Sequence, residues 1–283
     1  MKNTKVRVAF LSILSNTFLI ILKLIIGIIS GSVSIISEAI HSVMDLIAAM
    51  IAYFSVRISD NPPDSRHPYG HGKIENISGV IEALLIFVAA TLIIIEAIKK
   101  LWKGVTELEW IWLGAIVMFI SAIVNFFVSR KLYKVARQTN SIALEADALH
   151  LKTDIYTSLG VAVGLMLIYF TDIYWFDPVI AILVALMIFY ESIKLLKKAF
   201  SPLLDAAWNE KDINKLTEKL SQLNAQYYNL KTRTAGNYKF AELHLEVNKD
   251  ESVEKAHQRC DLIENELAKM FENLTVTIHI EPK

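Results

Sequence analysis

The chain has 283 residues, 54% of them hydrophobic, and a mean hydropathy of +0.41. Lysine plus arginine and aspartate plus glutamate both number 29, so the charge balance points to neither a nucleic acid nor an acidic partner. The single cysteine, Cys260, excludes a disulfide framework or a thiolate cluster within one chain.

Long apolar segments occupy the first two thirds of the chain, each near the roughly 20 residues that a helix needs to cross a bilayer. Five are plain: 8–29, 33–56, 77–98, 110–128 and 178–196. A sixth, 142–170, carries five ionisable residues in its first half and is apolar only from residue 156. We predict a span there too, because the apolar half is too short to cross alone and the polar residues recur at helical spacing.

Six spans place both termini on one side of the membrane. Basic residues concentrate before the first span, around residues 57–73, at 130–137 and at 194–198, which favours a cytoplasmic location for both termini. The positive-inside count has one exception, because the predicted topology would place Lys99, Lys100 and Lys103 outside the cell. We therefore expect a multi-pass protein of the cell membrane, embedded in the lipid bilayer.

From about residue 206, apolar residues alternate with polar ones. The pattern predicts a helix over 212–223, strands over 227–234 and 240–247, a helix from the N-cap Ser252 to about 271, and a strand over 274–280. The predicted fold is thus a membrane α-helical bundle of six transmembrane helices, residues 1–205, followed by a small cytoplasmic α+β domain, residues 206–283. Its αββαβ order suggests a ferredoxin-like topology.

Two His-x-x-x-Asp pairs lie in predicted spans: His41 with Asp45, and His150 with Asp154. A separation of four places both side chains of a pair on one helix face. His41 lies about eight residues into its span and Asp154 about twelve into its own, so both pairs fall near the midplane. Two opposed faces would offer two imidazoles and two carboxylates, a tetrahedral set suited to Zn²⁺. Charged groups are costly in lipid, and a divalent ion would offset that cost.

These pairs, together with three sequence strings, give the chain its resemblance to a known family. The strings are Ser-Glu-Ala-Ile-His-Ser-Val-Met-Asp at 37–45, His-Pro-Tyr-Gly-His-Gly-Lys-Ile-Glu at 67–75 and Glu-Ala-Asp-Ala-Leu-His-Leu-Lys-Thr-Asp at 145–154. The sequence resembles the cation diffusion facilitator family over nearly its whole length. The resemblance implies a homodimer that exchanges a divalent metal for protons by alternating access. It also implies a transport site made by His41, Asp45, His150 and Asp154. A histidine at the position of His41 goes with zinc preference in that family.

Further site residues are expected outside this quartet. Asp64, His67 and His71 have a spacing that suits three metal ligands, and the resemblance implies a metal site at these loop positions. It also implies a metal site in the cytoplasmic domain and a charge pair between Lys73 and Asp205 in the dimer. The residues matching the cytoplasmic metal site are His244, His257, His279 and Glu281. Tyr228 stands where some members have a further histidine and Glu281 where they have aspartate, so this site could hold two ions, one or none.

The predicted function is divalent-metal efflux with zinc preferred and coupled to protons, and not an enzymatic activity. Zn²⁺ is expected as substrate and as a structural or regulatory ligand, without an organic cofactor or nucleic acid partner. Leu149 precedes His150 on its cytoplasmic side and is a candidate hydrophobic gate. Three alternatives stay open: the same transporter for Fe²⁺, Co²⁺, Mn²⁺ or Cd²⁺, an intramembrane zinc metalloenzyme, and a metal-sensing receptor. The enzyme is disfavoured because no His-Glu-x-x-His motif is present and the quartet would fill all four coordination positions.

Overall fold

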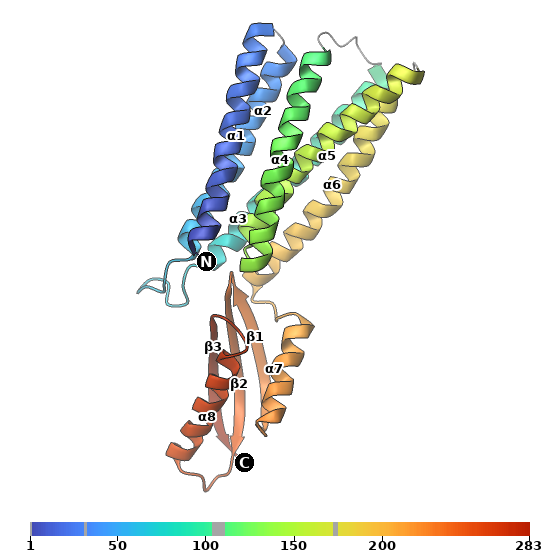
Figure 1. Ribbon diagram of the computed structural model, residues 1–283. Coiled ribbons are helices and arrows are strands. Elements are labelled where there is room, and N and C mark those ends of the chain that lie inside the picture. The colour runs from blue at the N-terminus through green and yellow to red at the C-terminus, as the bar shows by residue number, and fades with distance from the viewer. Residues whose placement is uncertain (1, 31–32, 104–110, 172–174) are drawn as a thin grey trace. The chain divides into compact units, whose positions relative to one another are not determined.

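The computed structural model describes residues 2–30, 33–103, 111–171 and 175–283, which fall into two compact units, 1–200 and 201–283. Each unit is described by itself. Within the described residues, the first unit is a bundle of six long helices (Figure 1). They are α1 (Lys2–Ser30), α2 (Val33–Ser59), α3 (Lys73–Lys103), α4 (Ile111–Thr139), α5 (Ile142–Thr171) and α6 (Phe176–Phe200).

Five of these helices, α1, α2, α3, α4 and α6, are long and apolar enough to cross a membrane. The expectation of six spans is therefore supported for five only. The exception, α5, is a 30-residue helix that is not among these five, and the side chains of much of its apolar second half lie outside the described residues. Several helices also extend beyond the apolar segments that predicted them. Helix α4, for example, continues through the basic stretch 130–137 to Thr139.

The bundle exposes apolar side chains and buries polar ones, the reverse of a soluble protein. On α1, Phe10, Leu14, Phe18, Ile21 and Ile25 are exposed at helical spacing and form a lipid-facing stripe. The buried polar side chains belong to several helices: Ser12, Asn16, Lys23, Ser42, Asp45, Glu75, Glu82, Asp147 and Ser192. Polar groups facing the interior of a membrane bundle usually mark a path for ions or substrates.

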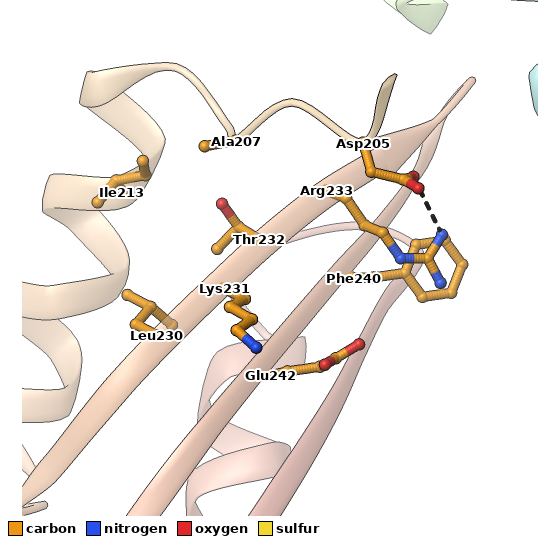
Figure 2. A pocket seen from close by; sticks show the side chains of 9 residues that line it. All are labelled: Asp205, Ala207, Ile213, Leu230, Lys231, Thr232, Arg233, Phe240 and Glu242. Carbon is orange, nitrogen blue, oxygen red and sulfur yellow. Dashed lines mark ion pairs between the residues drawn. The ribbon is translucent and has the colours of Figure 1, made fainter. Parts of the chain in front are cut away.

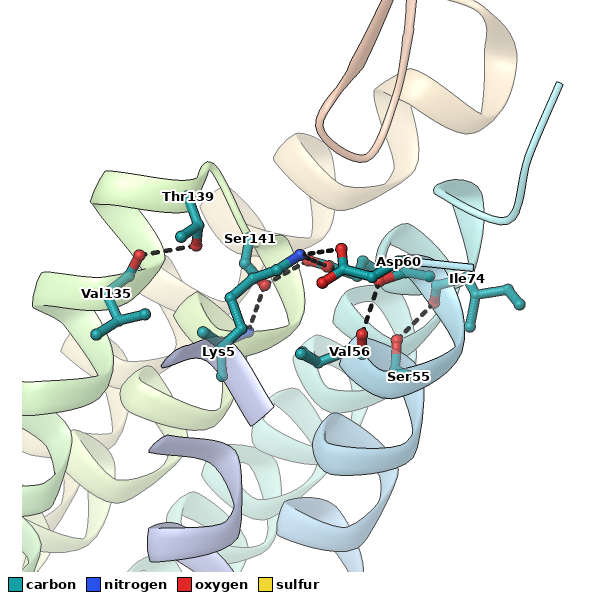
Figure 3. A network of polar contacts seen from close by, with 11 residues as sticks. Lys5, Ser55, Val56, Asp60, Ile74, Val135, Thr139 and Ser141 are labelled. Carbon is teal, nitrogen blue, oxygen red and sulfur yellow. Dashed lines mark hydrogen bonds and ion pairs between the residues drawn. The ribbon is translucent and has the colours of Figure 1, made fainter. Parts of the chain in front are cut away.

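Helices α1, α3 and α5 begin at one end of the bundle, where a buried ion network joins them to the end of α2 (Figure 3). Lys5 Nζ lies 2.6 Å from Asp60 Oδ1 and 2.9 Å from Glu75 Oε1. Glu75 also accepts hydrogen bonds from the hydroxyls of Ser59 and Ser141. We call this the charged end of the bundle. Its four helices are held together by side chains that water barely reaches.

The second unit begins with a 3-10 turn (Ser201–Leu204) and has the expected αββαβ order (Figure 1). Its elements are α7 (Glu210–Gln222), β1 (Tyr227–Ala235), β2 (Tyr238–Val247), α8 (Val253–Ala268) and β3 (Leu274–Pro282). The sheet order is β1-β2-β3, with β1 antiparallel and β3 parallel to β2. Ser252 caps α8 as predicted, since its hydroxyl accepts the Lys255 N–H.

One apolar core joins both helices of this unit to one face of the sheet. It contains Leu216 and Leu220 of α7, Leu243 and Leu245 of β2, and Ile263 of α8. Successive strand residues point to opposite faces, so His244, between the two leucines of β2, lies on the face turned away from this core. That face carries three of the four candidate metal ligands of the domain: His244, His279 and Glu281.

Candidate metal sites

Helices α2 and α5 bring together side chains separated by more than 100 residues in sequence. His150 Nε2 lies 3.0 Å from Asp45 Oδ1. Asp154, one turn after His150 on α5, joins them, so that one ligand atom from each of the three residues lies within 4.8 Å of the others. We call Asp45, His150 and Asp154 the membrane cluster. One imidazole and two carboxylates make a ligand set that suits a divalent transition metal.

The fourth member of the predicted quartet is His41. Its backbone is helical and lies one turn before Asp45 on α2, while its side chain lies outside the described residues. The structure therefore brings three of the four predicted ligands together.

A cavity of about 690 Å³ extends from the membrane cluster toward the end of the bundle opposite the charged end. Besides the cluster it is lined by Lys23 late in α1, Glu96 late in α3 and Pro178 early in α6. Asp45 and His150 side chains keep only 8% and 12% of their surface exposed. The cluster is thus screened from solvent but borders a space large enough for a hydrated ion.

Toward the charged end, the cluster is bordered by packed side chains instead. Leu149 is buried against Ala83 and Ile86 of α3 and Ile188 of α6. The candidate gate residue is therefore also a packing residue in this conformation. The accessible side of the cluster is the one that faces away from the charged end.

The loop between α2 and α3 holds a second cluster, which we call the loop cluster. It consists of Asp64, His67 and His71, whose ligand atoms also lie within 4.8 Å of one another. Asp64 Oδ1 accepts the backbone N–H groups of His67 and Arg66 at 2.7 and 2.9 Å. These hydrogen bonds hold the pKa of Asp64 below its ordinary value, and the bond from the His67 N–H has the largest effect. His71 Nδ1 is buried and has no hydrogen-bond partner among the described residues. A metal ion would meet an already ionised carboxylate here.

A third cluster lies on the sheet of the second unit and follows from strand register. Tyr228 of β1 pairs with His244 of β2, which pairs with His279 of β3, and Glu281 lies two residues further on the same face. His244 Nδ1 is 3.0 Å and His279 Nε2 is 3.6 Å from Glu281 Oε1. We call His244, His279 and Glu281 the sheet cluster.

Two residues around the sheet cluster alter its ligand capacity. Tyr228 donates its hydroxyl to the second Glu281 oxygen, and Asn229 Nδ2 lies 3.2 Å from His244 Nε2. Tyr228, which stands where the resemblance implied a further histidine, therefore engages the carboxylate that a metal would use. Asn229 was not predicted, because its side chain reaches the cluster from a positive-φ position at a break in the β1 register.

The remaining predicted site residues lie apart from these clusters. His257 on α8 has an exposed side chain with Nε2 3.7 Å from Asp261 Oδ1, and it does not join the sheet cluster within the described chain. Lys73 begins α3 in the first unit. Asp205 belongs to the second unit, where it lies 3.8 Å from Arg233 Nη1 beside a cavity of about 440 Å³ between α7 and the sheet (Figure 2). The pairing of Lys73 with Asp205 stays a prediction.

Two family descriptions match consecutive parts of the chain: "cation efflux transmembrane domain" over residues 9–204 and "cation efflux protein, cytoplasmic domain" over residues 209–283. The chain belongs to the cation diffusion facilitator family. Members of this family are transporters, so the intramembrane metalloenzyme alternative is excluded. Membership also confirms a multi-pass membrane protein with a small cytoplasmic domain.

Relatives agree with cation diffusion facilitator membership over most of the chain. An uncharacterized transporter of Synechocystis sp. is 33% identical over 257 residues, covering 90% of this chain and 83% of its own. The manganese efflux system protein MneP of Bacillus subtilis is 27% identical over 285 residues, covering 98% and 95%. A solved structure of CzrB, described as a candidate zinc transporter in its zinc form, is 37% identical over 27% of this chain and 91% of its own, with a TM-score of 0.26.

Sequence reasoning missed one contact of the membrane cluster in this cation diffusion facilitator. Asn125 of α4 donates its side-chain N–H to Asp154 Oδ2 at 3.4 Å, and both residues line the cavity. Ser121, one turn earlier on α4, is buried and also lines it. An asparagine and a serine four apart in an otherwise apolar span were a signal that could have identified α4 as the third wall of the site.

Proposed function

We propose that this chain exports a divalent cation, zinc preferred, across the cell membrane as a homodimer that exchanges metal for protons by alternating access. The observation that carries the proposal is the convergence of Asp45, His150 and Asp154 beside a cavity that, among the described residues, reaches toward the end of the bundle opposite the charged end. A site accessible from one side and packed on the other is what one state of an alternating-access cycle requires.

Six spans with both termini in the cytoplasm fit this proposal. Helix α5 would be the sixth span, with its charged residues facing the bundle interior rather than lipid. The charged end, where α1 begins, would then face the cytoplasm. The cavity would extend toward the outside, and Leu149 would close the cytoplasmic side of the cluster.

Zinc preference is supported by the ligand chemistry. Adding His41 to the membrane cluster gives two nitrogen and two oxygen ligands, the borderline set that Zn²⁺ favours over harder ions. Fe²⁺, Co²⁺, Mn²⁺ and Cd²⁺ are the competing ions, and the Bacillus subtilis relative is named for manganese. A metal needs neutral imidazole and ionised carboxylate, so protons and metal compete for the same atoms. We infer that His41 and His150 carry the exchanged protons.

The loop cluster and the sheet cluster are proposed as regulatory or structural zinc sites. Both present three ligand atoms within 4.8 Å of one another. In the homodimer, His257 would complete the sheet cluster from the partner subunit, and Lys73 and Asp205 would form the charge pair that the family resemblance implies.

The test is uptake of several metals into everted membrane vesicles by the wild type and by Asp154→Ala. Removing one carboxylate leaves the ion with too few ligands, so zinc uptake is expected to fall at least tenfold. Glu96→Gln is the matched control, because Glu96 lines the same cavity away from the cluster. Zinc uptake that survives Asp154→Ala would refute the proposed site. Preferred uptake of another ion that also depends on Asp154 would correct the substrate and keep the site.

A further inference from the structure

Two acidic side chains inside the bundle belong to none of the clusters described above. Glu82 of α3 and Asp147 of α5 have no exposed surface at all. Each keeps one carboxylate oxygen, Glu82 Oε2 and Asp147 Oδ2, buried and without a hydrogen-bond partner among the described residues. Buried carboxylates are normally saturated with donors, so two such vacancies require an explanation.

The other oxygen of each carboxylate accepts one serine hydroxyl. Ser78 Oγ lies 3.2 Å from Glu82 Oε1 on the same helix, and Ser12 Oγ of α1 lies 3.1 Å from Asp147 Oδ1. Both serines are buried. Four oxygen-bearing side chains from three helices therefore lie in the dry interior with one hydrogen bond for each carboxylate.

The packing around them brings the two carboxylates to one level of the bundle. Ala83 and Ile86, beside Glu82 on α3, share a buried core with Ala146 and Leu149, which flank Asp147 on α5. The charges of Glu82 and Asp147 act on each other, and both also act on His150. Two like charges in a low-dielectric interior repel each other unless a proton or a metal cation neutralises them.

We propose that Glu82, Asp147, Ser12 and Ser78 form a second cation site, made entirely of oxygen ligands and suited to a hard divalent ion. Carboxylates and hydroxyls without imidazole or thiolate are the ligands that Mn²⁺, Mg²⁺ and Ca²⁺ prefer. A cation would occupy both vacant oxygens and neutralise the pair. The serine hydroxyls can rotate from donating to a carboxylate to coordinating the ion through their lone pairs.

The position of this oxygen site gives it a role that rests on the proposed transport function. Asp147 precedes His150 by three residues, about 4.5 Å along α5 toward the charged end. Glu75 of the charged end lies about two turns before Glu82 on α3. The oxygen site, made by Glu82, Asp147, Ser12 and Ser78, would thus bind cations transiently on their way between the charged end and the membrane cluster. It accepts divalent ions broadly, and selection for zinc falls to the histidine-bearing cluster beyond it.

The test counts Mn²⁺ ions bound to the purified full-length protein in lipid nanodiscs. Mn²⁺ alone is the probe, because its paramagnetic resonance signal distinguishes free from bound ion. The double variant Glu82→Gln, Asp147→Asn keeps side-chain shape and removes both charges. It is expected to bind one Mn²⁺ fewer per chain than the wild type. The matched variant Asp45→Asn, Asp154→Asn disables the membrane cluster and is expected to keep that ion.

A milder pair of variants guards against misfolding. Ser12→Ala and Ser78→Ala leave both carboxylates in place and are expected to weaken Mn²⁺ binding at this site by roughly tenfold. Unchanged Mn²⁺ stoichiometry and affinity in the Glu82, Asp147 double variant would overturn the proposal and assign protons to the vacant oxygens. That result would leave the transport function standing if zinc uptake still depends on Asp154. Zinc uptake independent of Asp154 would instead remove the transport proposal while a lost Mn²⁺ ion still established the oxygen site.

Discussion

Glu281 shows how neighbouring side chains change the chemistry of a candidate metal ligand. Its carboxylate accepts hydrogen bonds from Tyr228 and His244. Both bonds lower its pKa below the ordinary value, and the bond from Tyr228 has the larger effect. A carboxyl whose pKa is lowered on folding stabilises the fold above its unfolded pKa, and this stabilisation is lost as pH falls through the folded pKa. The same hydroxyl that stabilises the anion also engages an oxygen that a metal ion would need.

Tyr228→Phe is therefore expected to have two opposite effects. Loss of the hydroxyl raises the pKa of Glu281 toward the ordinary value of a glutamate, and it frees one oxygen for metal. Zinc affinity at the sheet cluster should rise several-fold, measured by calorimetric titration in the background Asp154→Ala to silence the membrane cluster. Tyr227→Phe, the neighbouring tyrosine, serves as control. Equal or weaker zinc binding after Tyr228→Phe would show that the tyrosine does not compete with metal.

Glu266 supplies a pH-dependent contact between α7 and α8. Hydrogen bonds from Lys219 and Lys269 lower its pKa to about 2. Because this pKa is lowered, the stabilisation is complete above about 4.3 and disappears as pH falls through about 2. Lys219→Met should raise the Glu266 pKa, which carboxyl-labelled NMR titration would measure. Lys255→Met is a control on the same domain. A Glu266 pKa still near 2 after Lys219→Met would assign the effect to Lys269 alone.

At the scale of elements, Gly79 decides how closely α3 approaches its neighbours. A Cβ added at Gly79 would lie 2.5 Å from Ile142 Cγ2 of α5 and 3.1 Å from Ala199 Cβ of α6. Gly79→Ala is expected to destabilise the bundle by about 1–3 kcal/mol, measured as a loss of thermal stability in detergent. Gly160→Ala, where the nearest atom is 3.0 Å away, should cost less because the added Cβ overlaps its neighbour less, while the gain in helix propensity is the same at both positions. Equal stability of the two variants would contradict the close contact.

The charged end depends on Lys5, which compensates two buried carboxylates, Asp60 and Glu75. Removing one partner of a buried ion network leaves uncompensated charge, so Lys5→Met is expected to cost about 3–5 kcal/mol of stability or to open this end of the bundle. The control is Lys198→Met, because Lys198 pairs with Glu145 at 2.6 Å but is 53% exposed, and exposed pairs contribute about 0–1 kcal/mol. The melting temperatures of the two variants in detergent would be compared with that of the wild type. An equal decrease in both variants would show that burial of the Lys5 network does not add to stability.

At the scale of the whole molecule, the arrangement in the membrane is the largest open prediction. Six spans require both termini on the same side of the membrane, which we propose is the cytoplasm, whereas five would separate them. Tags placed at the two ends should both be protected from protease in right-side-out vesicles and both be cleaved in everted ones. Cleavage of one tag in each preparation would mean that α5 does not span. The family match describes residues 209–283 as a cytoplasmic domain, so we expect the C-terminal tag on the cytoplasmic side.

Segment by segment, much of the fold could be predicted from sequence alone. Apolar length placed α1, α2, α3, α4 and α6, and apolar alternation placed β1, β2 and β3 to within two residues at each end. These patterns are local, because lipid contact and strand pleating act on each residue through its immediate neighbours. Helix ends were predicted less well, as α4 shows, because charged residues continue a helix after its apolar stretch has ended.

The sequence by itself determined which residue types could bind metal, since His-x-x-x-Asp on a helix gives one ligand face wherever the helix lies. Only the tertiary structure decided that Asp45 meets His150, that Asn125 supports Asp154, and that Glu82 and Asp147 share one level with vacant oxygens. These relations depend on the rotation and offset of one helix against another. Helix rotation and offset are set by packing contacts between residues far apart in the chain, such as the close approach at Gly79, and no local pattern encodes them.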